Sequence, residues 1–212
     1  MKKNIVLFVL FVLPIVAYLF FASGVNSFSK LPTLTPSIPE LGNWQSLDST
    51  PVKLDGKITV LGFGGDEILD RRGGLFNLNQ KVYQRYHKFN DLQFVYVCPL
   101  GTEADVARIL TQFSGFTDIS QWKFVFAPKD EIIAYHKQLK LAGALDATAG
   151  TFNVYLVDKQ RNLRGRKGDD YKEGYDVSSP ADLSNEMLDD FKIILYEYRA
   201  ALKKNNNASL KI

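Results

Sequence analysis

The 212-residue chain contains a single cysteine, Cys98. One thiol allows no disulfide within the chain and no pair of thiols that exchange electrons. In an oxidising compartment a lone cysteine is best kept buried, and we expect Cys98 to be a buried side chain. The alternative is a reactive thiol between a strand end and a helix start, where the pKa of a cysteine is lowered.

Histidine is almost as scarce, because His87 and His136 are the only two. Both fall in predicted helices among charged neighbours, so we expect them on solvated helix faces. With Cys98 they supply at most three metal ligands, and their spacing gives no support for a zinc site. The chain also lacks a basic stripe with interleaved aromatic residues, and its net charge of only +3 argues against nucleic acid as a partner.

The strongest feature that is present is an uninterrupted apolar run from Ile5 to Ala22. About 18 helical residues span roughly 27 Å, which is close to the hydrocarbon thickness of a bilayer. Two lysines precede the run and predict a cytoplasmic N-terminus with the rest of the chain exported. We therefore expect a single-pass anchor at 1–22 in the cell membrane, which contacts the lipid bilayer through residues 5–22. The domain behind it is then extracytoplasmic, and periplasmic in a Gram-negative cell. A cleaved signal peptide is the alternative.

Residues 23–47 are rich in Ser, Pro, Thr and Asn. Their prolines disfavour helical geometry in the preceding residues, so this stretch is predicted to be an extended spacer. Residues 48–204 have the composition of a globular domain, and about 190 residues after the anchor suffice for one hydrophobic core. The Asn-rich end at 205–212 is expected to be disordered.

Short β-branched and aromatic runs alternate with helical periodicity along the predicted domain. This alternation predicts an α/β fold with a largely parallel sheet and an antiparallel hairpin at one side. That outline is typical of a thioredoxin-like fold, with a central mixed sheet flanked by helices. We expect strands over 58–63, 92–97, 122–126, 151–157 and 163–166, and helices over 75–89, 102–113, 129–139 and 179–204.

Several of these segments resemble one family. Residues 56–63 (Gly-Lys-Ile-Thr-Val-Leu-Gly-Phe) look like the first core strand of thioredoxin-like proteins. Residues 122–126 (Trp-Lys-Phe-Val-Phe), together with 155–158 and 163–165, resemble the Sco/SenC family more specifically. The resemblance covers about residues 50–204. It implies a membrane-anchored, copper-binding thioredoxin-like protein that assists cytochrome c oxidase assembly.

The metal and redox residues of that family are missing here. Counted from Phe63, the two cysteines of its CxxxC motif would fall at Ile68 and Arg72. Counted back from residues 155–157, its ligand histidine would fall near Gly150. A Cu(I) site requires thiolates and imidazole, whereas an arginine cation repels a metal. No shift of the comparison supplies the cysteines, because Cys98 is the only one. We therefore expect a degenerate member without copper, dithiol chemistry or a cofactor.

The segment Gly64–Gly74 stands where that family has its active loop, at the end of the first strand, where α/β folds place functional loops. Its charged side chains are compatible with a surface that binds a partner protein, but a solvated loop left after loss of the site is the favoured one of the two interpretations. These side chains are Asp66, Glu67, Asp70, Arg71 and Arg72.

A second charged group surrounds the predicted hairpin. A solvated hairpin of mixed charge is favoured there over a basic patch that binds anionic lipid or an acidic protein. The group consists of Arg161, Arg164, Arg166 and Lys167, followed by Asp169 and Asp170.

Together, these observations predict a tethered binding or assembly module without enzymatic activity, whose partner is a membrane or envelope protein. The family resemblance implies a role in building respiratory complexes such as cytochrome oxidase. Two alternatives stay open: a structural envelope protein, and a single-cysteine thiol peroxidase or reductase that uses Cys98. Val97-Cys98-Pro99 is similar to a peroxiredoxin motif, but the proline and threonine that precede the cysteine in that family are Asp91 and Val95 here.

Overall fold

The computed structural model describes residues 8, 10–16 and 30–209, and for 203–209 it describes the backbone alone. The chain divides into two units, residues 1–30 and residues 31–212. In the first unit, residues 10–16 are helical. Among the described residues, no helix combines the length and the apolar character that crossing a membrane requires. The predicted anchor at 5–22 lies largely outside the described residues and stays a prediction.

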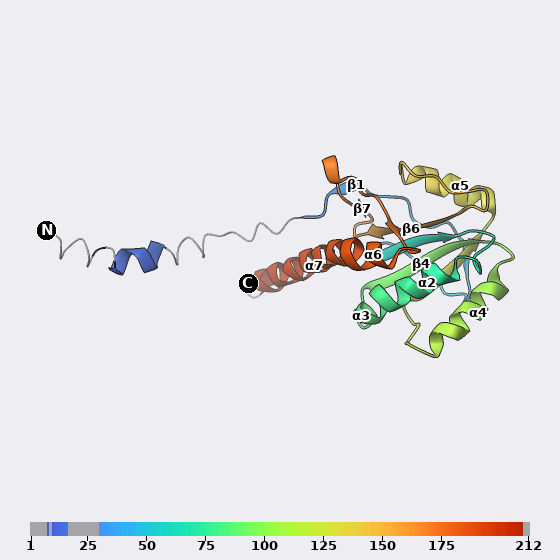
Figure 1. Ribbon diagram of the computed structural model, residues 1–212, viewed down its shortest axis with the longest axis horizontal. Coiled ribbons are helices and arrows are strands. Elements are labelled where there is room, and N and C mark those ends of the chain that lie inside the picture. The colour runs from blue at the N-terminus through green and yellow to red at the C-terminus, as the bar shows by residue number, and fades with distance from the viewer. Residues whose placement is uncertain (1–7, 9, 17–29, 210–212) are drawn as a thin grey trace. The chain divides into compact units, whose positions relative to one another are not determined.

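The second unit alternates strands with helices, as the sequence predicts (Figure 1). The strands are β1 (Thr33–Thr35), β2 (Gln45–Ser46), β3 (Ile58–Gly64), β4 (Leu92–Pro99), β5 (Trp122–Ala127), β6 (Gly150–Val157), β7 (Leu163–Arg164) and β8 (Tyr175–Asp176). The helices are α2 (Arg72–Leu78), α3 (Gln84–Tyr86), α4 (Glu103–Ser114), α5 (Lys129–Gln138), α6 (Pro180–Asp182) and α7 (Leu188–Ser209). Wide π-helical turns, η1 (Asn79–Tyr83) and η3 (Leu183–Met187), connect α2 to α3 and α6 to α7, and η2 (Gly168–Asp170) is a short 3-10 helix.

The strands form a mixed sheet in the order β1-β7-β6-β3-β4-β5-β2, and β8 pairs with β6. β3, β4 and β5 run parallel, so that Phe94 is paired with Val60 on one side and with Trp122 on the other. β6 runs antiparallel to β3 and forms the predicted antiparallel hairpin with β7. The predicted α/β class, with a central mixed sheet flanked by helices, is confirmed.

Side chains that alternate along the central strands build two separate cores. On β4, Phe94 and Tyr96 belong to the core that α2, α4 and α7 cover, whereas Val95 and Val97 belong to the core under α5. Gly62 lies beneath the ring of Tyr96, where an added methyl group would come within 2.5 Å of the ring. The glycine therefore gives the aromatic side of the sheet the room that it needs.

The segment before β3 is part of the domain. β1 pairs with β7 and β2 pairs with β5, at opposite edges of the sheet. Leu31 and Ile38 are buried. The prediction of a spacer over 23–47 is therefore wrong from Leu31 onward, and the domain begins there instead of at residue 48. Proline excludes helix but is tolerated beside edge strands, where its missing N–H is not needed.

The C-terminal helical segment begins as predicted but ends later. Ser179 Oγ accepts a hydrogen bond at 3.2 Å from the backbone nitrogen of Asp182, and Pro180 occupies the first helical position. The helix continues past the predicted end at residue 204 as far as Ser209. The predicted disorder of 205–212 is therefore wrong over 205–209, because asparagine lowers helix propensity only modestly and these residues continue a helix that has already formed before them. Residues 210–212 lie outside the described part.

Candidate functional site

The loop of residues 65–71, between β3 and α2, lies at the edge of the sheet where the carboxyl ends of β3, β4 and β5 meet. Open α/β sheets place their binding sites at this edge. The amino end of β6 joins the same edge, because Gly64 pairs with Gly150. The fold thus brings together segments that are far apart in the sequence.

Cys98 lies beneath this loop with no exposed surface. A methyl group added to Gly64 would lie 2.8 Å from Cys98 Sγ and 2.8 Å from Ile68 Cδ1, so these three residues pack against one another. Burial raises the pKa of the Cys98 thiol far above its usual range. The thiol is therefore protonated at neutral pH, and the thiolate that acts as a nucleophile or metal ligand is not formed. Cys98 is the buried side chain that we expected.

Arg71 turns into the site, and its side chain is only 11% exposed. Its guanidinium donates hydrogen bonds to the carboxylate of Asp146 and, at 3.0 Å, to Thr148 Oγ1. The same group lies 4.9 Å from the ring centroid of Phe152 and passes over Gly150, where an added methyl group would meet Nε at 3.0 Å. Arg71 thus ties the β3–α2 loop to the segment that leads into β6.

Asp146 stays ionised in its ion pair with Arg71. Partial burial would raise its pKa, but hydrogen bonds from Thr148, Arg71 and the Gly150 backbone outweigh burial and lower the pKa of Asp146 to about 2. The carboxylate is therefore ionised throughout the neutral range, and its ion pair with Arg71 persists. A backbone hydrogen bond of 3.0 Å from Asp66 N to Thr148 O holds the loop at a second point.

The other charged residues of the loop are exposed. They are Asp66, Glu67, Asp70 and Arg72. Asp66 forms an ion pair with Lys129 at the start of α5. Two large apolar side chains at the same edge, Leu100 after β4 and Phe152 in β6, are also exposed. We call the surface made by Asp66, Glu67, Asp70, Leu100 and Phe152 the loop face.

The residues at this edge do not fit a copper ion. Ile68 offers hydrocarbon packed on Cys98, Gly150 offers no side chain, and Arg72 is an exposed cation. A Cu(I) ion needs thiolate or imidazole ligands, which none of these positions supplies. Within the described part of the chain, no three His, Cys, Asp or Glu side chains are grouped as metal ligands.

The solvated helix face predicted for His136 is wrong. The residue is 5% exposed, and its ring lies 5.0 Å from the Phe63 ring and 6.1 Å from the Tyr155 ring. His87 is partly exposed, and its ring stacks on that of Tyr83 at 5.7 Å.

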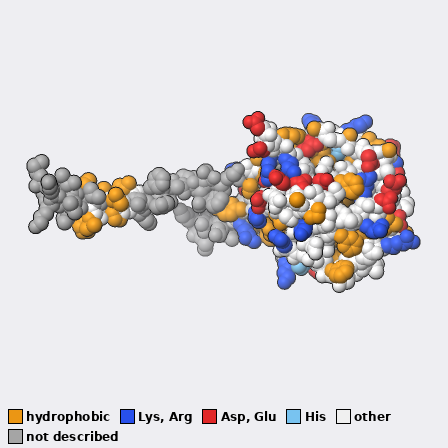
Figure 2. All heavy atoms as spheres, viewed as in Figure 1, with side chains coloured by type: hydrophobic (Ala, Val, Ile, Leu, Met, Phe, Trp, Pro, Cys, Tyr) orange, Lys and Arg blue, Asp and Glu red, His pale blue; other side chains and the backbone are white. Residues whose placement is uncertain are grey.

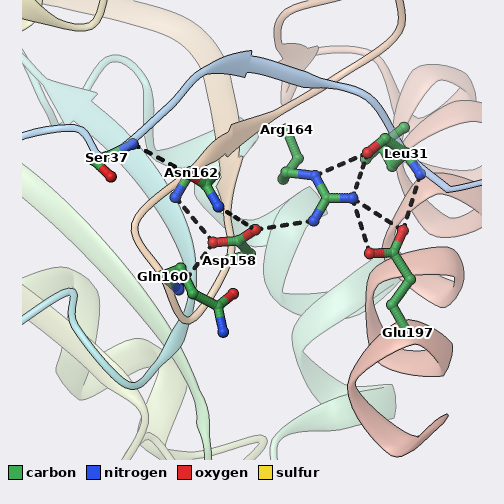
Figure 3. A network of polar contacts seen from close by, with 7 residues as sticks. All are labelled: Leu31, Ser37, Asp158, Gln160, Asn162, Arg164 and Glu197. Carbon is green, nitrogen blue, oxygen red and sulfur yellow. Dashed lines mark hydrogen bonds and ion pairs between the residues drawn. The ribbon is translucent and has the colours of Figure 1, made fainter. Parts of the chain in front are cut away.

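Arg164 of the hairpin is the centre of a buried ion-pair network that the sequence did not predict (Figure 3). Its side chain is 9% exposed and donates hydrogen bonds of 2.9 Å to both Asp158 and Glu197. Arg164 Nε also donates to the carbonyl oxygen of Leu31 at 2.8 Å. The network joins β7 to α7 and to the first residue of the domain.

The other basic residues of the hairpin region differ in exposure and in their ion-pair partners. Arg166 is paired with Glu186 and Asp190, and Lys167 is exposed. Blue and red side chains are interleaved over the face seen in Figure 2. Mixed charge is therefore the better of the two predictions for Arg166 and Lys167, but neither prediction describes the buried Arg164.

Comparison with known proteins finds similarity in structure alone. No protein-family model matches the chain, and no curated protein matches it. A proposed protein disulfide isomerase from Bacteroides thetaiotaomicron covers 81% of this chain and 98% of its own length, with a TM-score of 0.55 and 11% identity. BsSco, a member of the Sco family of cytochrome c oxidase assembly proteins, covers 78% of this chain and 97% of its own, with a TM-score of 0.52 and 12% identity. These similarities show a thioredoxin-like fold.

Proposed function

We propose that this chain is a membrane-tethered thioredoxin-like module that binds a partner protein through the loop face and performs no thiol or copper chemistry. The observation that carries the proposal is the state of Cys98, which is buried under Gly64 and Ile68 with a raised pKa. A single-cysteine peroxidase or reductase needs a thiolate that its substrate can reach. The site therefore favours recognition over catalysis.

The geometry of the loop supports a binding role. Arg71 fixes the inner side of the loop, and the pair of Asp66 with Lys129 fixes its outer side. A loop that is already ordered loses little conformational entropy when it binds. Leu100 and Phe152 then offer apolar contact area, while Glu67 and Asp70 give orientation through charge.

The proposed partner is a membrane or envelope protein. Residues 5–22 hold the domain at the outer side of the membrane in this proposal, which limits its partners to proteins in or near the bilayer. BsSco belongs to a family of assembly proteins for cytochrome c oxidase. The shared fold and the predicted tether support a role in assembling membrane complexes, with respiratory complexes as the first to examine.

Thiol labelling tests the absence of cysteine chemistry. In the native protein we expect Cys98 to react with a thiol reagent no faster than the chain opens, and to react as a free thiol in urea. A fast reaction at neutral pH in the folded protein contradicts the proposal and favours the single-cysteine enzyme.

Site-specific crosslinking tests the binding surface. A photo-crosslinking residue at Asp70 is expected to capture a discrete partner in native membranes. The matched control is Asn90, which is exposed just before β4 at the opposite edge of the sheet. Adding Glu67→Lys to the chain labelled at Asp70 should weaken the capture by about fivefold, the effect of roughly 1 kcal/mol at a charged rim. Equal capture at both positions, or none at Asp70, contradicts the loop face as the binding surface.

A further inference from the structure

The C-terminal end of α7 extends beyond the core of the domain. Leu195, Tyr198 and Leu202 follow one another at helical spacing on a single apolar stripe. Leu195 is 4% exposed, Tyr198 is partly buried, and Leu202 is 43% exposed. The apolar stripe therefore becomes more exposed to solvent toward the C-terminal end of the helix. All residues from Arg199 to Leu202 are exposed, and the helix continues to Ser209 (Figure 1).

This end of the chain carries charge of one sign. The residues after Glu197 include four bases and no acid: Arg199, Lys203, Lys204 and Lys211. A basic helix with an apolar residue among its charges is the pattern of a segment that lies at the surface of an anionic membrane.

Hydrogen bonds join α7 to Leu31, the first residue of the domain. Leu31 N donates a hydrogen bond of 3.0 Å to Glu197 Oε1, and Arg164 bridges the Leu31 carbonyl and Glu197 (Figure 3). The extension of α7 therefore begins beside Leu31. From Glu197 to Ser209 it covers about 18 Å at 1.5 Å per residue.

With residues 5–22 in the bilayer, as proposed above, the length of the chain before the domain limits the distance between Leu31 and the membrane. Residues 23–30 separate the predicted membrane segment from Leu31, and even fully extended they span at most about 29 Å. Leu31 consequently stays within about that distance of the membrane, and the α7 extension is long enough to cover much of it. A short tether also raises the effective concentration of lipid to the millimolar range, so that a weak contact suffices.

We propose that residues 199–209 of α7 form a second membrane contact, which binds the headgroups of anionic phospholipids through basic side chains and places Leu202 at the interface. The proposal rests on the proposed tether. Each base near an anionic leaflet strengthens binding by about fivefold, so Arg199, Lys203 and Lys204 together contribute about a hundredfold. The contact limits how the domain turns on its tether and so orients the loop face.

The test uses the full chain reconstituted in lipid nanodiscs, with a spin label at an introduced Asn206→Cys. Cys98 stays unlabelled because it is buried. In discs that contain phosphatidylglycerol, the label should lose mobility and become less accessible to a water-soluble relaxation agent than in discs of phosphatidylcholine. High salt should reverse the effect, since the Debye length is about 3 Å at 1 M.

Matched charge reversals separate a specific contact from net charge. Reversal of Arg199, Lys203 and Lys204 to Glu should abolish the dependence on lipid composition. Reversal of three exposed bases elsewhere, Lys53, Lys88 and Lys167, should leave it intact. An equal loss in both triple variants, or no difference between the two lipids, overturns the proposal.

A failure of the tether is distinguishable from a failure of the lipid contact. A chain that does not enter the discs overturns the tether. The labelled chain is then mixed with preformed phosphatidylglycerol vesicles at low salt. If the vesicles immobilise the label and the charge reversal at 199, 203 and 204 abolishes this effect, the lipid contact is supported; if the label stays mobile, the lipid contact is overturned. Immobilisation that appears only after membrane proteins are added assigns the helix to a protein partner and also overturns the lipid proposal.

Discussion

The imidazole of His136, on the inner face of α5, packs edge-on against the rings of Phe63 and Tyr155. Burial lowers the pKa of His136 because the charged imidazolium loses its hydration, and the carboxylate of Glu173 acts weakly in the opposite direction. The folded protein therefore holds His136 neutral at pH values where the unfolded chain, with a pKa near 6.5, has begun to bind a proton.

This difference predicts a loss of stability in mild acid. The contribution of His136 is fully present above about pH 6.5 and is lost as the pH falls through the lower folded pKa. Urea unfolding between pH 7.5 and 5 should show a smaller decline for His136→Gln than for the native chain. The control His87→Gln, at a partly exposed site, should keep the native slope. An identical slope in all three proteins would falsify the prediction.

Arg71 is expected to control the order of the loop more than the stability of the whole domain. Its partner Asp146 is about half exposed, so Arg71→Met should lower the free energy of unfolding by only about 1 kcal/mol. Residues 65–70 lose their main tie in that variant, and their amide hydrogen exchange should rise well before that of β3. Glu67→Gln, at an exposed position of the same loop, is the control. Unchanged exchange in Arg71→Met would show that the Asp66–Thr148 backbone hydrogen bond and the Asp66–Lys129 ion pair hold the loop without Arg71.

At the residue scale, the sequence predicts what can be counted and misses what depends on distant partners. The lack of a second cysteine is visible directly, and so is the lack of family ligands at Ile68 and Gly150. The inward turn of Arg71 is not, because its partner Asp146 is 75 positions away along the chain. The burial of His136 is not visible either, because its neighbours in the sequence are charged, although it lies one turn after Ile132 on the buried side of α5.

α2 begins at Arg72, three positions earlier than the first apolar residue of the predicted helix at 75. The sequence places Gly73 and Gly74 in the predicted loop, but both lie in the first turn of this helix. Their surroundings differ. Nothing lies within 4 Å of a methyl group added to Gly73, whereas one added to Gly74 would meet Val177 Cγ2 at 2.5 Å.

Substitution by alanine should change the free energy of unfolding in opposite directions at these two neighbouring positions. Gly73→Ala removes the conformational freedom of an exposed helical glycine and should raise the free energy of unfolding by up to about 1 kcal/mol. Gly74→Ala forces α2 away from Val177 and should lower it by about 1–3 kcal/mol. Urea denaturation of the two single variants measures both, and a change of equal sign would contradict this packing.

At the element scale, the long strands are predictable, whereas of the short strands only β7, in the predicted hairpin, is. The predicted strands 58–63 and 122–126 match β3 and β5 within one residue at each end, because continuous β-branched and aromatic runs mark buried strands. β1 and β2 have three and two residues, too few for any periodicity. Their pairing depends on β7 and β5, which come later in the chain, so the segment resembles a spacer when it is taken alone.

On the scale of the whole molecule, the first residues of the domain are joined to its last helix. Arg164 contacts Leu31 at one end of the domain and Glu197 near the other. Burial of these charges is tolerated because each is paired, and an unpaired member of such a network costs several kcal/mol. The ordering of α7 and the position of Leu31 are thereby coupled.

The segment 31–47 supplies the last prediction, which concerns where the folding unit begins. A chain that starts at Leu31 should fold, whereas one that starts at residue 48 lacks β1, β2 and the buried side chains of Leu31 and Ile38. Burial of one such side chain stabilises by about 1.5–3 kcal/mol, so these two alone account for about 3–6 kcal/mol of the 5–15 kcal/mol typical of a domain.

The shorter chain also loses two hydrogen bonds that α5 and the residue after it make with this segment, from Thr35 Oγ1 to Leu139 O at 2.7 Å and from Tyr135 Oη to Pro39 O at 3.0 Å. Urea unfolding followed by far-UV circular dichroism should give a cooperative transition for the chain from Leu31 and a much lower midpoint, or no cooperative transition, for the chain from residue 48. Ile38→Ala in the longer chain should lie between them, at a loss of about 2–5 kcal/mol. If both truncated chains unfold at the same urea concentration, residues 31–47 contribute no stability to the domain. A much lower midpoint for the shorter chain would show that this proline-containing segment stabilises the fold.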